Sequence, residues 1–117
     1  MDMFEALAEP TRRDIIEIVA NNGEMPASGI YEKFHVSHPA ISQHLKILRE
    51  ANLLNVEKRA QQRIYRLNPK TMSQMEKWAR RMMQTWDERF DALDNVLREE
   101  KGKIAAKNKM GNKHGRK

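Results

Sequence analysis

The chain has 117 residues, the length of a single domain, of which 39% are hydrophobic and 32% are charged. It contains no cysteine, which excludes disulfides, thiol catalysis and thiolate metal sites. No apolar run approaches the ~20 residues of a membrane span, and the N-terminus lacks the pattern of a secretory signal, so we expect a cytoplasmic protein.

The formal net charge of +6 is unevenly distributed along the chain. Residues 1–32 carry two basic and seven acidic groups, a net charge of −5, whereas residues 33–66 carry seven basic and two acidic groups, a net charge of +5. Residues 67–100 have a net charge of −1, and the last seventeen residues carry seven basic groups and no acid. A nucleic-acid contact is therefore expected in the basic middle segment.

Apolar spacing and capping residues predict four helices in the first half of the chain. Residues 3–8 have helical spacing, and Pro10 suits the first turn of a second helix, where an amide hydrogen would be unpaired. A third, short helix follows Pro26. Ser37 is expected to cap a fourth helix that runs to about Ala51.

The second half of the chain predicts a hairpin and one long helix. Two runs of good strand formers, 54–58 and 63–67, indicate a β-hairpin. From Thr71 to about Lys101, apolar residues recur every three or four positions over a stripe too wide for so small a domain to cover, which indicates packing against another subunit. Residues 101–117 are basic and poor in apolar side chains, and predict a disordered tail.

This order of elements predicts a mainly α protein with a small β-hairpin, namely a winged helix-turn-helix with a long C-terminal dimerisation helix. An α-helix fits the major groove of DNA, its N-terminal amides favour a phosphate, and a basic hairpin can reach a neighbouring groove. We therefore expect residues 1–100 to form one DNA-binding and dimerisation domain.

The apolar stripe of the fourth helix indicates which of its side chains face DNA. At 100° per residue, the face opposite Ile41, Leu45 and Leu48 is centred on four residues: Pro39, Gln43, Lys46 and Glu50. Gln43 can form two hydrogen bonds with adenine, and Lys46 can reach guanine or a phosphate. His44 falls beside Leu45 on the core side, so we expect a packed histidine with a polar partner.

Three blocks of sequence, 7–13 (LAEPTRR), 37–51 (SHPAISQHLKILREA) and 63–67 (RIYRL), closely resemble the ArsR family of bacterial transcriptional repressors. The resemblance covers residues 3–100. It implies a homodimer that binds double-stranded operator DNA at an imperfect palindrome, represses an operon and releases the DNA on a signal. The effector would be a small molecule or a protein.

The chain lacks the metal-binding residues of the metal-sensing members of this family. Those members carry two cysteines in the helix before the recognition helix, and the matching positions here are Pro26 and Ser28. Another family site uses His and acidic residues of the last helix, and the long helix here has no His. A zinc site of His35, His38 and His44 lacks a cysteine or nearby acid to complete a tetrahedral set. We therefore expect no metal and no cofactor.

Two sets of candidate residues follow. Contacts with DNA are expected from the fourth helix and the hairpin: Ser37, His38, Pro39, Ser42, Gln43, Lys46, Lys58, Arg59, Gln62 and Arg63. A dimer interface is expected from the first and last helices: Phe4, Leu7, Met75, Trp78, Met82, Trp86, Phe90 and Leu93.

Alternative functions have weaker support in the sequence. No nucleophile–base grouping, glycine-rich phosphate loop or carboxylate pair stands out, so we expect no enzyme. A winged-helix module that binds a partner protein would be favoured by an acidic recognition face and a neutral wing, and neither is found. An RNA-binding protein using the tail would need aromatic stacking residues, which residues 101–117 lack.

The family's wing tip usually contains glycine, and Arg59-Ala60-Gln61-Gln62 does not, which leaves the type of turn open.

Overall fold

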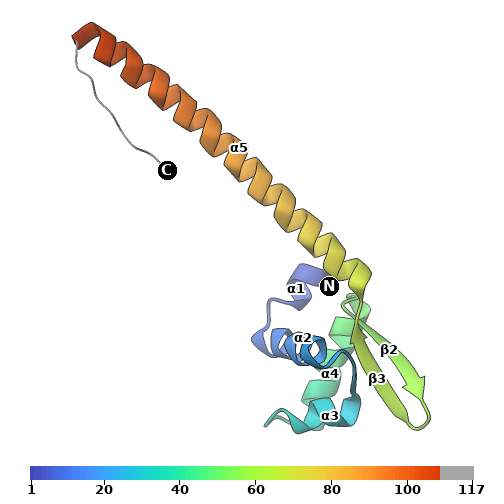
Figure 1. Ribbon diagram of the computed structural model, residues 1–117. Coiled ribbons are helices and arrows are strands. Elements are labelled where there is room, and N and C mark those ends of the chain that lie inside the picture. The colour runs from blue at the N-terminus through green and yellow to red at the C-terminus, as the bar shows by residue number, and fades with distance from the viewer. Residues whose placement is uncertain (109–117) are drawn as a thin grey trace. The chain divides into compact units, whose positions relative to one another are not determined.

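The computed structural model describes residues 1–108, and their side chains as far as residue 102. The chain forms two units, a head of residues Met1–Glu76 and a second unit that begins at Lys77. Its elements in chain order are α1 (Met3–Ala6), α2 (Pro10–Asn22), β1 (Met25–Pro26), α3 (Ala27–Glu32), α4 (His38–Glu50), β2 (Leu54–Arg59), β3 (Gln62–Leu67) and α5 (Pro69–Asn108) (Figure 1). This order is the predicted winged helix-turn-helix followed by a long helix.

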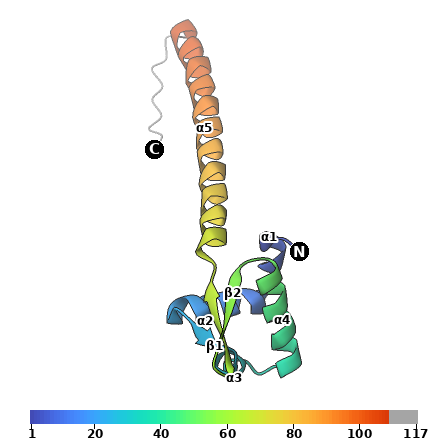
Figure 2. The ribbon, with the colours of Figure 1, turned by 90° about the vertical axis from the view of Figure 1, so that its right-hand side faces the viewer.

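The core of the head lies where α2, α3 and α4 meet the sheet. Helix α4 packs beside β2, and α2 and α3 contact β3 (Figure 2). The largest fully buried side chains come from α2, α3, α4 and the two leucines where β2 begins: Ile15, Val19, Ile30, Ile41, Leu45, Leu48, Leu53 and Leu54. Burial of each such side chain contributes about 1.5–3 kcal/mol, so the apolar stripe of α4 fixes the rotation of this helix.

Capping residues set the ends of α4 as the sequence predicts. The Ser37 hydroxyl oxygen accepts a hydrogen bond from the amide of Ala40, at 3.3 Å, and Pro39 lies in the first turn. Past the other end of the helix, Asn52 adopts φ 62°, a left-handed conformation in which Asn is second only to Gly. The predicted Ser37 cap and the predicted end of this helix near Ala51 are therefore confirmed.

The sheet has three strands, where the sequence predicted a hairpin alone. The predicted hairpin is present as β2 and β3, and β1 adds to the other edge of β3 with Met25 opposite Tyr65 and Pro26 opposite Ile64. A two-residue strand that contains proline has no alternating pattern, which is why the sequence did not reveal it. Its pairing covers the edge of β3 and fixes the chain between α2 and α3.

The wing, which is the hairpin of β2 and β3, turns over two residues. Arg59 lies opposite Gln62, so Ala60 and Gln61 form the turn. Ala60 adopts φ 57°, a left-handed conformation that favours glycine. The departure from the family's usual glycine therefore leaves the two-residue hairpin intact, with strain at Ala60.

Helix α5 is longer than the sequence predicted. It begins at Pro69, with the Asn68 side-chain oxygen accepting a hydrogen bond from the amide of Lys70, and it continues to Asn108. Residues 101–108 are therefore helical where a disordered tail was expected, and the rest of the predicted tail, 109–117, lies outside the described residues. The prediction of disorder used the average composition of residues 101–117, which gives little weight to the two strong helix formers Ala105 and Ala106. Among the described helices, none is long and apolar enough to cross a membrane.

Candidate nucleic-acid interface

The exposed face of α4 carries the side chains predicted to read DNA. Ile41, Leu45 and Leu48 are buried, and Gln43 and Lys46 are exposed, so the predicted rotation of the helix is confirmed. All ten residues predicted to contact DNA are solvent-exposed in the head: Ser37, His38, Pro39, Ser42, Gln43, Lys46, Lys58, Arg59, Gln62 and Arg63. Exposure makes these residues accessible to a nucleic acid, but their surroundings differ from one residue to the next.

His38, at the N-terminus of α4, is oriented by an aromatic residue that the sequence analysis did not single out. Its ring stacks on Tyr31 of α3, with ring centroids 4.5 Å apart and an interplanar angle of 14°. Aromatic pairs at this separation attract one another beyond their buried area. The stack therefore joins α3 to the first turn of α4 and limits the orientations of the His38 ring. No short-range pattern in the sequence indicates it.

His44 lies on the inner side of α4, in a polar network with Arg12 and Glu9 of the preceding helix. Arg12 is buried, and its Nε donates a hydrogen bond to the carbonyl of Ala6 at 2.6 Å. Its Nη1 lies 3.3 Å from His44 Nδ1, and His44 Nε2 lies 3.3 Å from Glu9 Oε2. The guanidinium can only donate, so Nδ1 accepts and the ring proton on Nε2 faces Glu9. The expected packed histidine with polar partners is confirmed.

Glu9 connects this network to the start of α2. Its Oε1 accepts a hydrogen bond from the amide of Thr11 at 2.8 Å, which caps the helix. This hydrogen bond lowers the pKa of Glu9 most, burial opposes it, and the electrostatic interactions with His44 and Arg12 lower the pKa further. Because Glu9 Oε2 is buried with no hydrogen bond of its own in the described structure, the 3.3 Å approach of His44 is its polar contact. The network therefore connects α4 to α1 and α2.

One face of the wing presents two cations without carboxylate partners. Lys58 and Arg63 lie directly opposite each other on β2 and β3, and both are exposed. In the described part of the chain, no acidic side chain forms an ion pair with either of them. Like charges directly opposite on neighbouring strands repel each other, so an anion such as a phosphate would relieve the repulsion.

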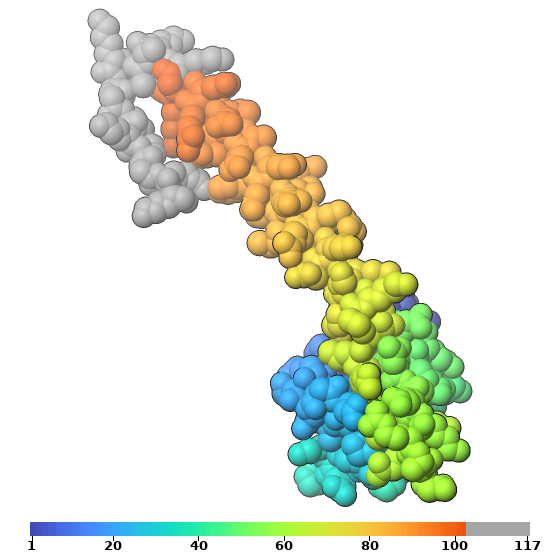
Figure 3. Space-filling model, turned by 45° about the vertical axis from the view of Figure 1, so that its right-hand side comes forward, coloured from blue at the N-terminus to red at the C-terminus, as the bar shows by residue number. Residues whose placement is uncertain are grey.

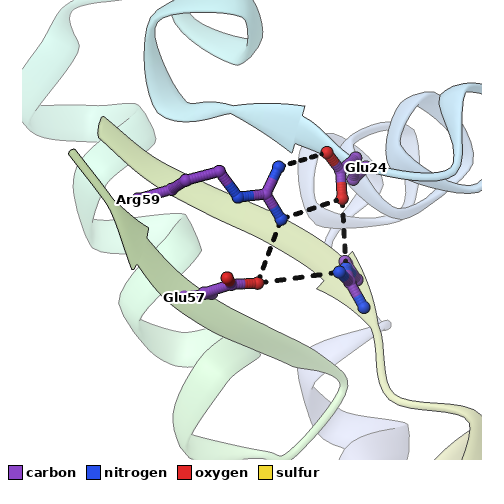
Figure 4. A network of polar contacts seen from close by, with 4 residues as sticks. Glu24, Glu57 and Arg59 are labelled. Atoms are coloured by element: carbon purple, nitrogen blue, oxygen red, sulfur yellow. Dashed lines mark hydrogen bonds and ion pairs between the residues drawn. The ribbon is translucent and has the colours of Figure 1, made fainter. Parts of the chain in front are cut away.

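The opposite face of the wing carries a network of four charged residues, Glu24, Glu57, Arg59 and Arg66, here called the wing ion-pair network (Figure 4). Arg59 Nη1 donates to Glu24 Oε2 at 2.7 Å, and Arg59 Nη2 donates to Glu57 Oε1 at 3.1 Å. Arg66 Nε donates to Glu24 Oε1 at 3.2 Å, and Arg66 Nη2 lies 3.6 Å from Glu57 Oε1. The hydrogen bond from Arg59 lowers the pKa of Glu24, and the two carboxylates raise the pKa of Arg59.

Arg59 therefore has two carboxylate partners in the structure, and its contact with DNA stays a prediction. Glu24 is not predictable from a local pattern, because it lies 35 residues before its partner Arg59. Glu57 and Arg59 are two residues apart on β2, and side chains at this spacing share a face of a strand. This spacing is the local sign of the network in the sequence.

The positions that match the family's metal-binding cysteines line a hollow of about 300 Å³ between the start of α3 and the tip of the wing. Its lining residues are Pro26, Ala27, Ser28, Gln61, Gln62 and Arg63. None of them offers a thiolate, an imidazole or a carboxylate to a metal ion. Within the described residues, no three or more His, Cys, Asp or Glu side chains gather in a group that could hold a metal.

The predicted dimer residues differ in how much apolar surface they expose. Trp78, Met82, Trp86, Phe90 and Leu93 of α5 are between 42% and 65% exposed, and Figure 3 shows the surface of this helix in yellow and orange. Phe4 of α1 is 39% exposed. Leu7 and Met75, in contrast, are partly buried against the core of the head, so they offer less surface to a second chain.

Comparisons with known proteins agree with this architecture. Residues 9–56 match the model of a family described as bacterial regulatory protein, arsR family. The transcriptional repressor SdpR of Bacillus subtilis (strain 168) is 35% identical over 77 residues, which cover 66% of this chain and 84% of that protein.

A second sequence relative and a solved structure are also similar to this chain. The HTH-type transcriptional regulator Rv2034 of Mycobacterium tuberculosis is 39% identical over 66 residues, which span less than two thirds of its length, 61%. The solved structure of an ArsR-like transcriptional regulator from Rhodococcus sp. RHA1 superposes with a TM-score of 0.70 and 26% identity, covering 80% of this chain and 87% of that one. All three of these proteins are described as regulators of transcription.

Proposed function

The chain belongs to the ArsR family of bacterial transcriptional regulators, and from this premise we propose that it is a homodimeric repressor that reads an imperfect palindromic operator without sensing a metal. In this proposal α4 enters the major groove, and the wing contacts the DNA backbone beside it. The protein acts in the cytoplasm, where its operator would be, and residues 1–100 form the DNA-binding and dimerisation domain.

The observation that carries the proposal is the exposed face of α4. Gln43 and Lys46 project from a helix whose opposite face is buried and whose N-terminus is capped, so their positions are fixed before DNA binds. Ser37, His38 and Pro39 lie at the end where the helix amides favour a phosphate. Lys58 and Arg63 supply the wing with charge for the neighbouring phosphates.

A second copy of the chain is the proposed partner of α5. Eight large apolar side chains of this helix are exposed: Trp78, Met82, Met83, Trp86, Phe90, Leu93, Val96 and Leu97. Water contact with so large an apolar surface is unfavourable, and two-fold pairing would bury it. The charges of the helix favour an antiparallel pair: residues 70–81 carry four basic groups and one acid, whereas residues 87–100 carry two basic groups and six acids. An antiparallel pair that crosses near Trp86 brings these opposite charges together.

The absence of metal sensing is proposed from the donor chemistry. The chain has no cysteine, and the hollow at Pro26 and Ser28 offers no ligand that a soft metal prefers. The signal would then be a small molecule or a protein.

The test is a selection of fragments from the source genome by the full chain, followed by competition between the selected operator and a scrambled duplex. We expect Gln43→Ala to cost about 1–3 kcal/mol on the operator and little on the scrambled duplex, because Gln43 would contact base edges. Arg63→Ala should weaken both complexes and reduce the salt slope, because an exposed wing cation would meet a phosphate. Selection of no preferred sequence would contradict the proposal and favour a module that binds a partner protein.

A further inference from the structure

The wing separates its basic residues into two groups by strand face. Lys58 and Arg63 share one face, and side-chain alternation puts Arg59 and Arg66 on the other, where both are paired with carboxylates. Two of the four wing cations therefore already have anionic partners, and the wing ion-pair network has no net charge.

The network is built across all three strands of the sheet. Glu24 directly precedes β1, which pairs antiparallel with β3. This pairing places the backbone of Glu24 opposite Arg66. From there its carboxylate accepts hydrogen bonds from Arg59 and Arg66, while Glu57 of β2 approaches the same two guanidinium groups (Figure 4). Each carboxylate thus contacts both arginines, and neither arginine depends on one acid alone.

The four side chains are between 40% and 53% exposed, so a phosphate could reach both arginines. An arginine binds carboxylate and phosphate with the same fork of donors, so Glu24 and Glu57 compete with the DNA backbone for Arg59 and Arg66. A cation that keeps its protein partner releases no counterion from DNA and adds nothing to sequence-independent affinity.

We propose that Glu24 and Glu57 are specificity-determining positioning residues, which hold Arg59 and Arg66 in ion pairs and so keep the wing from binding DNA phosphates of any sequence. The two acids lower non-specific affinity, and recognition is left to the exposed face of α4. This inference rests on the proposed function, because it concerns how the same surface discriminates between operator and other DNA.

The experiment compares the full-length variants Glu24→Gln, Glu57→Gln and their combination with a matched control, Glu17→Gln combined with Glu32→Gln. Glu17 and Glu32 are exposed on α2 and α3 and form no ion pair within the described residues, so the control changes the net charge equally and releases no arginine. The dissociation constant for a random-sequence duplex is measured at 50 and 200 mM salt, and that for the selected operator at 200 mM. Thermal unfolding of each variant checks the fold.

The ratio of the dissociation constants at 200 and 50 mM should rise by about 3.5-fold for each arginine released, the factor given by a slope of about 0.9 per phosphate contact. The combined variant should also bind random duplex more tightly, and its preference for the operator should fall. Adding Arg59→Gln and Arg66→Gln to the combined variant should remove the gain.

The proposal is overturned if the combined variant behaves like the matched control, if the gain survives the loss of both arginines, or if folded variants lose affinity for random duplex. Failure of the proposed function gives a different result, in which the parent chain prefers no sequence. The salt dependence on random duplex still tests the ion-pair network in that case.

Discussion

Replacement of His44 by alanine tests whether this residue holds α4 in place or contacts DNA. His44 is adjacent to Gln43 in sequence, yet its ring lies between Arg12 and Glu9, 3.3 Å from each. The substitution leaves buried Arg12 with its hydrogen bond to the Ala6 carbonyl and leaves Glu9 Oε2 without its polar contact.

The expected cost is about 2 kcal/mol of unfolding free energy. Each hydrogen bond to a charged group contributes about 1.5–3 kcal/mol when buried. The side chains of His44 and Glu9 are 22% and 33% exposed, so water compensates for part of the loss. For a domain the size of the head, 2 kcal/mol corresponds to a fall in Tm of roughly 8–16 °C.

The assay combines thermal unfolding, followed by circular dichroism, with competition between operator and scrambled duplex at a temperature where all proteins are folded. His35→Ala is the matched control, because His35 is exposed before α4 and forms no hydrogen bond, ion pair or ring contact within the described residues. The control should unfold like the parent, and His44→Ala should unfold earlier with its specificity ratio kept. An unchanged Tm together with a collapsed specificity ratio would refute the assigned rotation of α4.

Four further results are expected. Trp86→Ala combined with Phe90→Ala removes apolar groups that typically contribute roughly 3–5 kcal/mol each when buried, so sedimentation should find monomers where the parent is dimeric; a folded variant that stays dimeric would place the interface elsewhere. Ala60→Gly should raise the free energy of unfolding by about 0.5–1 kcal/mol in urea titrations, since it relieves the left-handed backbone, and a decrease would contradict this. The lowered pKa of Glu9 means that its ionised form stabilises the fold above the ordinary pKa of 4.5 and that this contribution is lost as the pH falls through the lower native value. Glu9→Gln should therefore make stability less dependent on pH in that acidic range, and an unaltered pH profile would argue against it. Zinc or arsenite at low micromolar concentration should leave operator affinity unchanged in a binding titration, and a tight, stoichiometric metal site coupled to operator release would contradict this.

The sequence allowed much of α4 to be predicted, because its determinants are local. The stripe of Ile41, Leu45 and Leu48 gives the period and rotation of the helix, and Ser37 and Asn52 mark its ends through their own side-chain and backbone preferences. The same reasoning predicted that His44 faces inward. Each of these conclusions needs only residues within one or two turns of one another.

The features that were missed depend on contacts between different helices and strands. Strand β1 is two residues long and exists through its pairing with β3, some forty positions later in the chain. The stack of His38 on Tyr31 and the ion pairs of Glu24 with Arg59 and Arg66 arise only when the fold brings their elements together. The periodicity of apolar residues along the chain indicates helices and strands, but it carries no information about contacts between them.

This difference changes how the charge of the chain bears on DNA binding. The sequence counts every cation of residues 33–66 alike, and their net charge of +5 marks the segment as basic. Glu24 belongs in sequence to the acidic segment of residues 1–32. In the fold, however, its carboxylate pairs with Arg59 and Arg66 of the wing. Among the described residues, the wing cations without a carboxylate partner are therefore Lys58 and Arg63, which lie on one face, and the proposed function places the DNA phosphates there. Net charge predicts that a surface binds DNA, whereas the pairing of each cation decides how much of that binding is independent of sequence.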